Sequence, residues 1–401
     1  MKLYKKHISD LGKVITGKTP RTSILENYGG KIPFLTPSDN LSEKFSPTTS
    51  KTLTKIGLNE VKNCLLPSKS ICVSCIGSDL GKVVLTKKPT VTNQQFNSIV
   101  PNEENDADFI YYLMTVVGKH LNYLSKTSTA VPIINKSTFS NYEIEIPNIT
   151  EQKRIGKILS SLDDKIELNR QINDNLEQQA QALFKSWFVN FEPFKNGQFV
   201  DSELGKIPKG WKVGYLSEIA DIIMGQSPNG STYNENGEGI IFYQGRAEFG
   251  TRFPSIRLFT TNPTRIAPAN SILISVRAPV GDINITHKEC CIGRGLASAV
   301  SRTNKSAFLL YTLFSLKSDL DRFNAEGTVF GSINRKALET LKILIPTNDI
   351  ISKFEAIVAS MDQQILILHI ESENLKILRD TLLPKLMSGE RSVIHKENND
   401  D

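Results

Sequence analysis

The stretch EQKRIGKILSSLDDKI occupies residues 151–166, and a related stretch, SKFEAIVASMDQQI, occupies residues 352–365. Each follows a short apolar segment that ends in Ile-Pro, at 146–147 and at 345–346. In both stretches apolar residues return at alternating steps of four and three, which is the spacing of a coiled-coil helix. The repetition therefore predicts two long helices at equivalent places in a duplicated chain.

The rest of the chain repeats in the same order. LGKVITGKTPRT (11–22) matches IADIIMGQSPNG (219–230), and SICVSCIGSDLGKVVLT (70–86) matches SILISVRAPVGDINIT (271–286). The offset between the copies drifts from 208 to 199 through the polar loops and is steady within the predicted elements, as expected of a duplicated fold. In each copy, short β-rich segments bounded by Gly, Pro, Asn and Ser precede the long helix.

These patterns predict a mixed α/β (α+β) fold with two tandem β-rich domains, each followed by a long helix. The predicted limits are 1–150 and 211–350 for the domains, 151–190 and 351–391 for the helices, 191–210 for a linker and 392–401 for a polar tail. Pro384 is predicted to kink or end the second helix, and Gly389 to cap it.

The apolar stripe of each long helix needs a partner. The simplest arrangement packs the two helices on each other as an antiparallel coiled coil, with a pseudo-two-fold relation between the repeats. The residues expected at this helix–helix contact are Ile155, Leu159, Leu162, Ile166, Leu176 and Leu183 in the first helix, and Phe354, Val358, Met361, Ile365, Leu375 and Leu382 in the second.

Positive charge is concentrated in the two domains. The net charge of the chain is +6, with an excess of +6 over residues 1–150 and +3 over 191–350, whereas the helical segments are near neutral. Two phosphate-binding modules on uncharged spacers would have this distribution. A helix of roughly 38 residues would be roughly 57 Å long, so the helices are expected to act as a spacer between two copies of one binding module.

Composition argues against several other classes. The chain is 39% hydrophobic and 22% charged, has no apolar run of about 18 residues and begins without a secretory signal, so no membrane association and a cytoplasmic location are expected. Five cysteines argue against a disulfide framework, and Cys72 and Cys75 are interpreted as buried thiols of a strand. His287, Cys290 and Cys291 lack a convincing fourth ligand, so no metal site is predicted.

No catalytic motif is evident. GSDLGKV (77–83) imitates a phosphate loop but is one residue short between its glycines, and Val83 stands where a Ser or Thr should meet Mg²⁺. GRGLAS (293–298) lacks the third glycine of a dinucleotide site. The chain is therefore predicted to have no catalytic residues.

The order of these motifs resembles the specificity subunits of type I restriction-modification systems. The resemblance covers essentially residues 1–391. The phrases that carry it are IPKGWKVGYLSEIADIIMGQSP (207–228), SVRAPVGDI (275–283), CIGRGLASAV (291–300), EQKRIGKILSSLDDKI (151–166) and LLPKLMSGERSV (382–393). Two departures are the absence of an IPKGW-like phrase before Leu3 and the second helix opening, ISKFEAI (351–357), which lacks the Glu-Gln found at 151–152.

The resemblance implies a DNA reader that is not itself an enzyme. Each domain would read one half-site of a bipartite target in double-stranded DNA, and the helices would dock two modification subunits. Those subunits would carry S-adenosylmethionine and methylate adenine, and restriction subunits would use ATP and Mg for translocation and cleavage. This chain would hold no cofactor.

Two other classes stay open at this point. A non-catalytic coiled-coil assembly scaffold would have uncharged or acidic modules, whereas these modules are basic. A nuclease or methyltransferase with an unrecognised site is disfavoured by the missing motifs.

Polar and basic residues in Gly/Pro-rich loops are the candidates for DNA contact, because loops present donors to the groove edges. Either a base or a phosphate could be the partner of each one. The candidates are Lys18, Thr19, Arg21, Asn93, Gln94, Gln95 and Asn97 in the first domain, and Gln226, Ser227, Gln244, Arg246, Arg277, Arg294 and Arg335 in the second.

Overall fold

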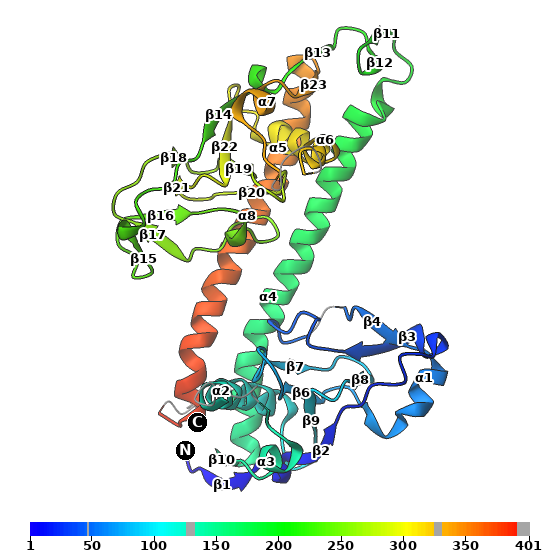
Figure 1. Cartoon of the computed structure of the whole chain (residues 1–401), viewed down its shortest axis with the longest axis vertical. Helices are drawn as coiled ribbons and strands as arrows, with labels where there is room; N and C mark the ends of the chain where they lie inside the picture. Colours follow the sequence, from blue (N-terminus) through cyan, green and yellow to red (C-terminus); the bar gives the residue numbers. More distant parts are fainter. Residues whose placement is uncertain (46–47, 126–132, 325–330, 391–401) are drawn as a thin grey trace, which may run out of the picture. The chain divides into compact units, whose positions relative to one another are not determined.

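The computed structural model describes residues 1–45, 48–125, 133–324 and 331–390, so the predicted polar tail lies outside the described residues. The chain forms two compact units (Figure 1). Unit 1 comprises Met1–Asn169 and the chain from Glu371 onward, and unit 2 comprises Arg170–Ile370. Each unit combines one β-rich domain with a segment of each long helix.

Unit 1 has two four-stranded sheets, with strand orders β2-β9-β6-β7 and β4-β3-β8-β5, and a two-stranded sheet β1-β10. Its strands are β1 (Tyr4–His7), β2 (Gly12–Thr16), β3 (Tyr28–Leu35), β4 (Lys51–Leu53), β5 (Leu65–Leu66), β6 (Ile71–Ser74), β7 (Val83–Leu85), β8 (Thr90–Thr92), β9 (Phe96–Pro101) and β10 (Glu143–Ile146). Its shorter helices are η1 (Ile8–Leu11), η2 (Leu25–Asn27), α1 (Lys55–Glu60), η3 (Lys62–Cys64), α2 (Ala107–Ser125) and α3 (Lys136–Ser140).

Unit 2 repeats this plan, with sheets β14-β22-β19-β20, β15-β17-β16-β21-β18 and β13-β23, and adds the hairpin β11-β12. Its strands are β11 (Phe199–Ser202), β12 (Gly205–Pro208), β13 (Lys212–Tyr215), β14 (Ala220–Met224), β15 (Tyr233–Asn234), β16 (Ile240–Tyr243), β17 (Leu258–Thr260), β18 (Ile266–Ala267), β19 (Ile272–Ser275), β20 (Ile283–Ile285), β21 (Cys290–Ile292), β22 (Leu296–Ser301) and β23 (Lys342–Ile345). Its shorter helices are η5 (Glu192–Phe194), η6 (Leu216–Glu218), η7 (Gly230–Thr232), η8 (Arg246–Glu248), α5 (Ser306–Ser315), α6 (Lys317–Arg322) and α7 (Arg335–Glu339).

One parallel strand pair stands out in each unit. β3 runs parallel to β8, with Leu35 opposite Thr92, and β16 runs parallel to β21, with Tyr243 opposite Ile292. Parallel neighbours end at the same edge of a sheet, so the loops that follow them leave the sheet side by side. This pairing decides which loops meet in the site described below.

The two predicted long helices are present. α4 runs from Ile149 to Phe184 and continues as one π-helical turn, η4 (Lys185–Val189), and α8 runs from Asn348 to Met387. Of the two alternatives predicted for Pro384, that it kinks or that it ends the second helix, the second is wrong, because α8 continues for three more residues to Met387. Proline lacks the N–H that would donate to the Asp380 carbonyl, but the Pro384 carbonyl still accepts from the Ser388 N–H at 2.9 Å, so the four-residue hydrogen-bond pattern resumes after the proline. Gly389 then adopts a left-handed φ of 76°.

Within each unit the segments of α4 and α8 pack antiparallel. In unit 1, Ile155 and Leu159 near the start of α4 share a core with Leu383 and Leu386 near the end of α8. In unit 2, Phe184 near the end of α4 shares a core with Phe354 and Val358 near the start of α8. Fully burying an aromatic or aliphatic side chain contributes about 1.5–3 kcal/mol, so a few such residues hold each helix pair to its domain.

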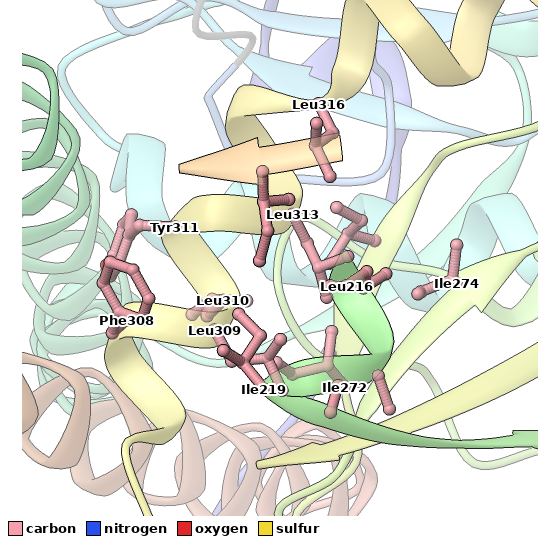
Figure 2. Close-up of a cluster of buried hydrophobic side chains, with 14 of the residues drawn as sticks. Leu216, Ile219, Ile272, Ile274, Phe308, Leu309, Leu310, Tyr311, Leu313 and Leu316 are labelled. Atoms are coloured by element: carbon pink, nitrogen blue, oxygen red, sulfur yellow. The ribbon is translucent and has the colours of Figure 1, made fainter. Parts of the chain in front are cut away.

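One helix packs on the sheet β2-β9-β6-β7 of unit 1, and another packs on the equivalent sheet β14-β22-β19-β20 of unit 2. In unit 2 this is α5, whose residues Ala307–Leu313 are all buried. Figure 2 shows Leu309 and Leu313 of α5 gathered with Leu216 and Ile272 in one apolar cluster. In unit 1, α2 has the corresponding place and contributes Phe109, Ile110 and Met114 to the core. The domain and the helix pair of each unit therefore share one continuous core.

Candidate nucleic-acid interface

Three loops meet at one edge of unit 1. They are residues 17–21 after β2, 36–39 after β3 and 93–95 between β8 and β9. The Lys18 amide donates to the Thr92 carbonyl at 2.9 Å, and the Asn93 amide donates to the Leu35 carbonyl at 3.1 Å. Gly17 permits this approach, because a Cβ there would lie 2.1 Å from the Asn93 carbonyl oxygen.

The equivalent loops of unit 2 meet in the same way. They are residues 225–228, 244–248 and 293–295. The Gln226 amide donates to the Ile292 carbonyl at 2.9 Å, and the Gly293 amide donates to the Tyr243 carbonyl at 2.8 Å. A Cβ at Gly225 would lie 2.1 Å from the Gly293 carbonyl oxygen. We call these two sets of loops loop cluster 1 and loop cluster 2.

Most first-domain candidates lie in loop cluster 1. Lys18 and Gln94 are exposed, and Thr19 Oγ1 donates to Gln94 Oε1 at 2.6 Å. The Arg21 guanidinium is exposed but paired with Glu60, from Nε to Oε1 at 3.1 Å. Exposed donors on a backbone held by glycine and hydrogen bonds are suited to contact a nucleic acid without large rearrangement.

Three amide side chains of unit 1 serve the fold. Asn93 Oδ1 accepts from the Gln95 amide at 3.1 Å, and Asn93 Nδ2 donates to Gln95 Oε1 at 2.8 Å, which closes the turn. Asn97 is 3% exposed. Its Oδ1 accepts from Thr16 at 2.7 Å and its Nδ2 donates to the Ile134 carbonyl at 3.2 Å. Asn97 is therefore engaged at both ends of its amide inside the domain.

In unit 2, the structure brings five of the seven candidates together. Gln226, Ser227, Gln244, Arg246 and Arg294 lie in loop cluster 2. The Arg294 amide donates to Ser227 Oγ at 3.2 Å, whereas Arg246 Nε pairs with Asp282. Arg277 is exposed on the segment that follows β19 and forms a backbone bridge with Ser332. Arg335 lies in α7, where its Nε pairs with Glu339 at 2.7 Å.

Sequence reasoning missed one loop of cluster 1. Residues 36–39 are the counterpart of Gln244–Ala247, and Ser38 is exposed there, while Thr36 and Asp39 close the loop by hydrogen bonds. The signal was present, because the offset of 208 that aligns Gly17 with Gly225 also aligns Thr36 with Gln244.

A second missed feature is a buried cation in each domain, again related by the offset of 208. Lys44 is 7% exposed, and its Nζ donates to Asp108 Oδ1 at 2.6 Å and to Ser160 of α4 at 2.8 Å. Burial alone would raise the pKa of Asp108, but the Lys44 ammonium outweighs it and the pKa is lowered. The domain of unit 1 is thus joined to α4 by a hydrogen bond from a buried ammonium as well as by apolar contact.

Arg252 is the counterpart in unit 2 and is 8% exposed. Its guanidinium pairs with Glu177 of α4 and, through Nη2 at 2.5 Å, with Asp362 of α8. Tyr311 donates to the same Asp362 oxygen at 2.9 Å. Burial raises the pKa of Asp362, and Arg252 opposes part of that rise. One side chain of the domain therefore ties both long helices together.

In unit 1 the aspartate equivalent to Asp362 is Asp163, which has a different cation. Tyr112 donates to Asp163, and Arg379 of α8 pairs with it at 2.6 Å. Further along the seam, Asn169 Nδ2 donates to Glu371 at 2.8 Å and Asn173 Nδ2 donates to the Ile365 carbonyl at 3.3 Å. Polar contacts of this kind can specify the register of a helix pair.

The residues expected at the helix–helix contact differ in burial. Those that are fully buried are Ile155, Leu159, Phe354, Val358 and Ile365, and those that are half-buried are Leu162, Ile166, Leu176, Leu183, Met361, Leu375 and Leu382. Several half-buried members still touch a core, such as Leu183 and Met361 in unit 2 and Leu382 in unit 1.

The cysteines lie in apolar surroundings. Burial raises the pKa of Cys72 and of Cys290 to about 12, and that of Cys75 to about 11, so these thiols are protonated at neutral pH and pack as small apolar groups. Within the described ranges, no group of three His, Cys, Asp or Glu side chains is arranged to hold a metal ion. No helix in the described part of the chain has the length and apolar character that crossing a membrane requires.

Comparison with known proteins gives concordant matches. The family model described as "Type I restriction modification DNA specificity domain" matches residues 2–178 and 208–376. The MjaIX specificity subunit of a type I restriction enzyme from Methanocaldococcus jannaschii is 30% identical, covering 97% of this chain and 93% of the relative. The MjaX specificity subunit from the same organism, a putative one by its name, is 34% identical over 78% of this chain and 76% of its own length.

A solved structure supports the fold. The S subunit of a type I restriction-modification system from M. genitalium is 20% identical to this chain, covers 96% of each chain and superposes with a TM-score of 0.61. The mixed α/β architecture with two tandem domains and two long helices is thus shared with that protein.

Proposed function

Because the chain belongs to the family of type I restriction-modification DNA specificity proteins, we propose that it selects the DNA target of such a complex without performing the chemistry. Each domain reads one half-site of a bipartite target in double-stranded DNA. The complex acts on cellular DNA, so we expect a cytoplasmic location.

The observation that carries this proposal is the pair of equivalent loop clusters. Both present exposed polar and basic side chains on a backbone held by glycine contacts and hydrogen bonds. Two such surfaces of different composition, one in each repeat, suit a protein that reads two different half-sites. The domains are also the basic parts of the chain, which favours phosphate contact beside base contact.

We further propose that two modification subunits dock on the long helices, and that restriction subunits join to add cleavage. α8 carries exposed apolar side chains, including Ile367, Ile370 and Ile377, which would be covered in such an assembly. S-adenosylmethionine and ATP with Mg belong to those partners. The helices hold the two half-sites at a set spacing.

The test is to express the chain with the modification subunits of its source genome and to map methylated adenines by single-molecule sequencing. We expect one bipartite motif with a spacer of constant length, and no methylation or cleavage by the purified chain with S-adenosylmethionine alone. Methyl transfer by the isolated chain would contradict the proposal. An assembled complex that methylates without any sequence preference would instead support the scaffold alternative.

A further inference from the structure

The two loop clusters share a backbone frame but differ at its central position. Gln94 follows Asn93 after β8, and Arg294 follows Gly293 after β21. The Phe96 amide donates to the Asn93 carbonyl at 3.2 Å, and the Leu296 amide donates to the Gly293 carbonyl at 3.0 Å. The loops after β2 and β14 also bond to β8 and β21 through equivalent backbone amides. Lys18 donates to the Thr92 carbonyl, and Gln226 donates to the Ile292 carbonyl. Gln94 and Arg294 are therefore equivalent residues of the two repeats.

The Arg294 guanidinium is exposed and available to bind a ligand. The side chain is exposed and forms no hydrogen bond or ion pair with any residue that the structure describes. Its backbone is anchored, because its amide donates to Ser227, and a Cβ on either flanking glycine would approach Gln244 or Gly245 closely. By contrast, Arg246 in the same cluster is paired with Asp282.

Gln94 is also exposed and is oriented by a neighbour. Thr19 Oγ1 donates to Gln94 Oε1 at 2.6 Å. This contact uses one lone pair of the amide oxygen and leaves the other lone pair and the amide NH₂ for a ligand. The side chain therefore presents one acceptor and donors side by side.

These two side chains suit different bases. Arginine pairs bidentately with O6 and N7 of guanine in the major groove, and glutamine pairs bidentately with N6 and N7 of adenine.

The two domains also differ in which basic residue they use, lysine in the first and mainly arginine in the second. Residues 1–150 contain seventeen lysines and a single arginine, Arg21, which is paired with Glu60, whereas residues 211–350 contain nine arginines and six lysines. Lysine presents a point charge, whereas arginine presents a planar fork of donors, so the two domains offer different donor geometries to a base.

We propose that Arg294 selects a guanine in the half-site read by unit 2, and that Gln94 selects an adenine in the half-site read by unit 1. This assignment rests on the proposed function and identifies one specificity-determining residue in each half of the reader.

The experiment uses the full chain assembled with its modification subunits, and measures binding to a library of duplexes that vary one base pair at a time around the mapped motif. In Arg294→Gln, preference for one guanine of one half-site should fall about tenfold or more, with the other half-site unchanged. In Gln94→Ala, preference for one adenine of the other half-site should fall similarly. Arg294→Lys keeps the charge and should still lose part of the guanine preference, because the lysine ammonium lacks the planar fork of donors that matches both guanine acceptors.

The matched control is Arg322→Gln, which removes the same charge from an exposed arginine on α6. It should weaken all duplexes equally or not at all, leaving base preferences intact. Thermal unfolding of each complex shows whether the variants are folded.

The outcomes separate this inference from the proposed function. If the unmodified complex shows no base preference at all, the proposed function fails. If it is specific and Arg294→Gln leaves every guanine preference intact, or alters both half-sites, the assignment of Arg294 is overturned while the function stands. The same reasoning applies to Gln94→Ala and adenine.

Discussion

At the scale of single residues, two buried cations help to explain how each β-rich domain is attached to the long helices. Lys44 and Arg252 lie at equivalent places in the two domains, and each contacts the long helices. Lys44 donates to Ser160 of α4, and Arg252 pairs with acidic residues of α4 and α8. A charge in such a place is costly unless its partners are all present, so these contacts favour one arrangement over others. Apolar contacts alone would permit more sliding, because they have no direction.

We predict that Arg252→Met destabilises the chain by about 3–5 kcal/mol at neutral pH, because Glu177 and Asp362 then lie together without a cation. Loss of the cation raises the pKa of Asp362 further above its usual value. The folded state then holds a proton that the unfolded state releases, so the free energy of unfolding falls as pH rises through this interval. The loss in free energy of unfolding of Arg252→Met, relative to the unmodified chain, should therefore be small near pH 4 and largest near pH 7.

Urea unfolding at a series of pH values measures this effect. Arg322→Met, which removes an exposed arginine paired with Asp319 of its own helix, should change stability by less than about 0.5 kcal/mol at every pH. A deficit for Arg252→Met that stays constant with pH would show that lost packing, and not the unpaired carboxylates, is responsible.

At the scale of elements, the long helices and the Gly-rich loops could be predicted from the sequence, whereas contacts made by single side chains could not. The four-and-three spacing from Ile155 and from Phe354 predicts the long helices, and the Gly-rich turns predict the loops at 17–21 and 225–228. Lys44 and Arg252 give no such signal, because a single basic residue in a loop looks like any solvated charge. Asn97 is polar and near a turn in the sequence, which predicts an exposed loop residue, but it lies in β9 and accepts a hydrogen bond from Thr16 inside the domain. Its orientation depends on strand pairing, which sequence spacing alone does not reveal.

The phase of α4 leads to a second prediction, concerning insertions after Asn175. Two inserted residues rotate the following helix by roughly 200°, which turns Ala180 and Phe184 away from the core of unit 2. Four inserted residues rotate it by roughly 400° and lengthen it by roughly 6 Å, which keeps the apolar side nearly in phase. We expect the two-residue variant to aggregate, and the four-residue variant to fold with a lower unfolding midpoint.

Solubility, the thermal unfolding midpoint and co-purification with modification subunits are the measurements. A four-residue insertion after Leu204, in the exposed turn of the β11-β12 hairpin, is the control for added length and should be tolerated. Equal behaviour of the two- and four-residue variants in α4 would mean that the phase of this helix does not matter.

At the scale of the whole molecule, the duplication gives each half its own loop cluster, its own core and its own buried cation in contact with the long helices. Loop cluster 1 and loop cluster 2 are made from separate parts of the chain and share no residue. Nothing in the construction of one cluster requires the particular side chains of the other. The two specificities should therefore be exchangeable independently.

We predict that replacing residues 1–150 with the first domain of another specificity subunit changes one half-site of the methylated motif and leaves the other half-site unchanged. The donor domain should carry a basic residue at the place of Lys44 and an acidic residue at the place of Asp108, because the retained Ser160 of α4 accepts a hydrogen bond from the Lys44 ammonium in the original junction. A matched pair of exchanges, one with that lysine and one with methionine in its place, separates reading from attachment. Both should recognise the same new half-site, since the loops are identical, but the methionine form should unfold at a lower temperature. Single-molecule methylation mapping of cells that carry each exchange measures the motif. Alteration of both half-sites by the single exchange would show that the two domains do not read independently, and that the reading surface extends across the repeats.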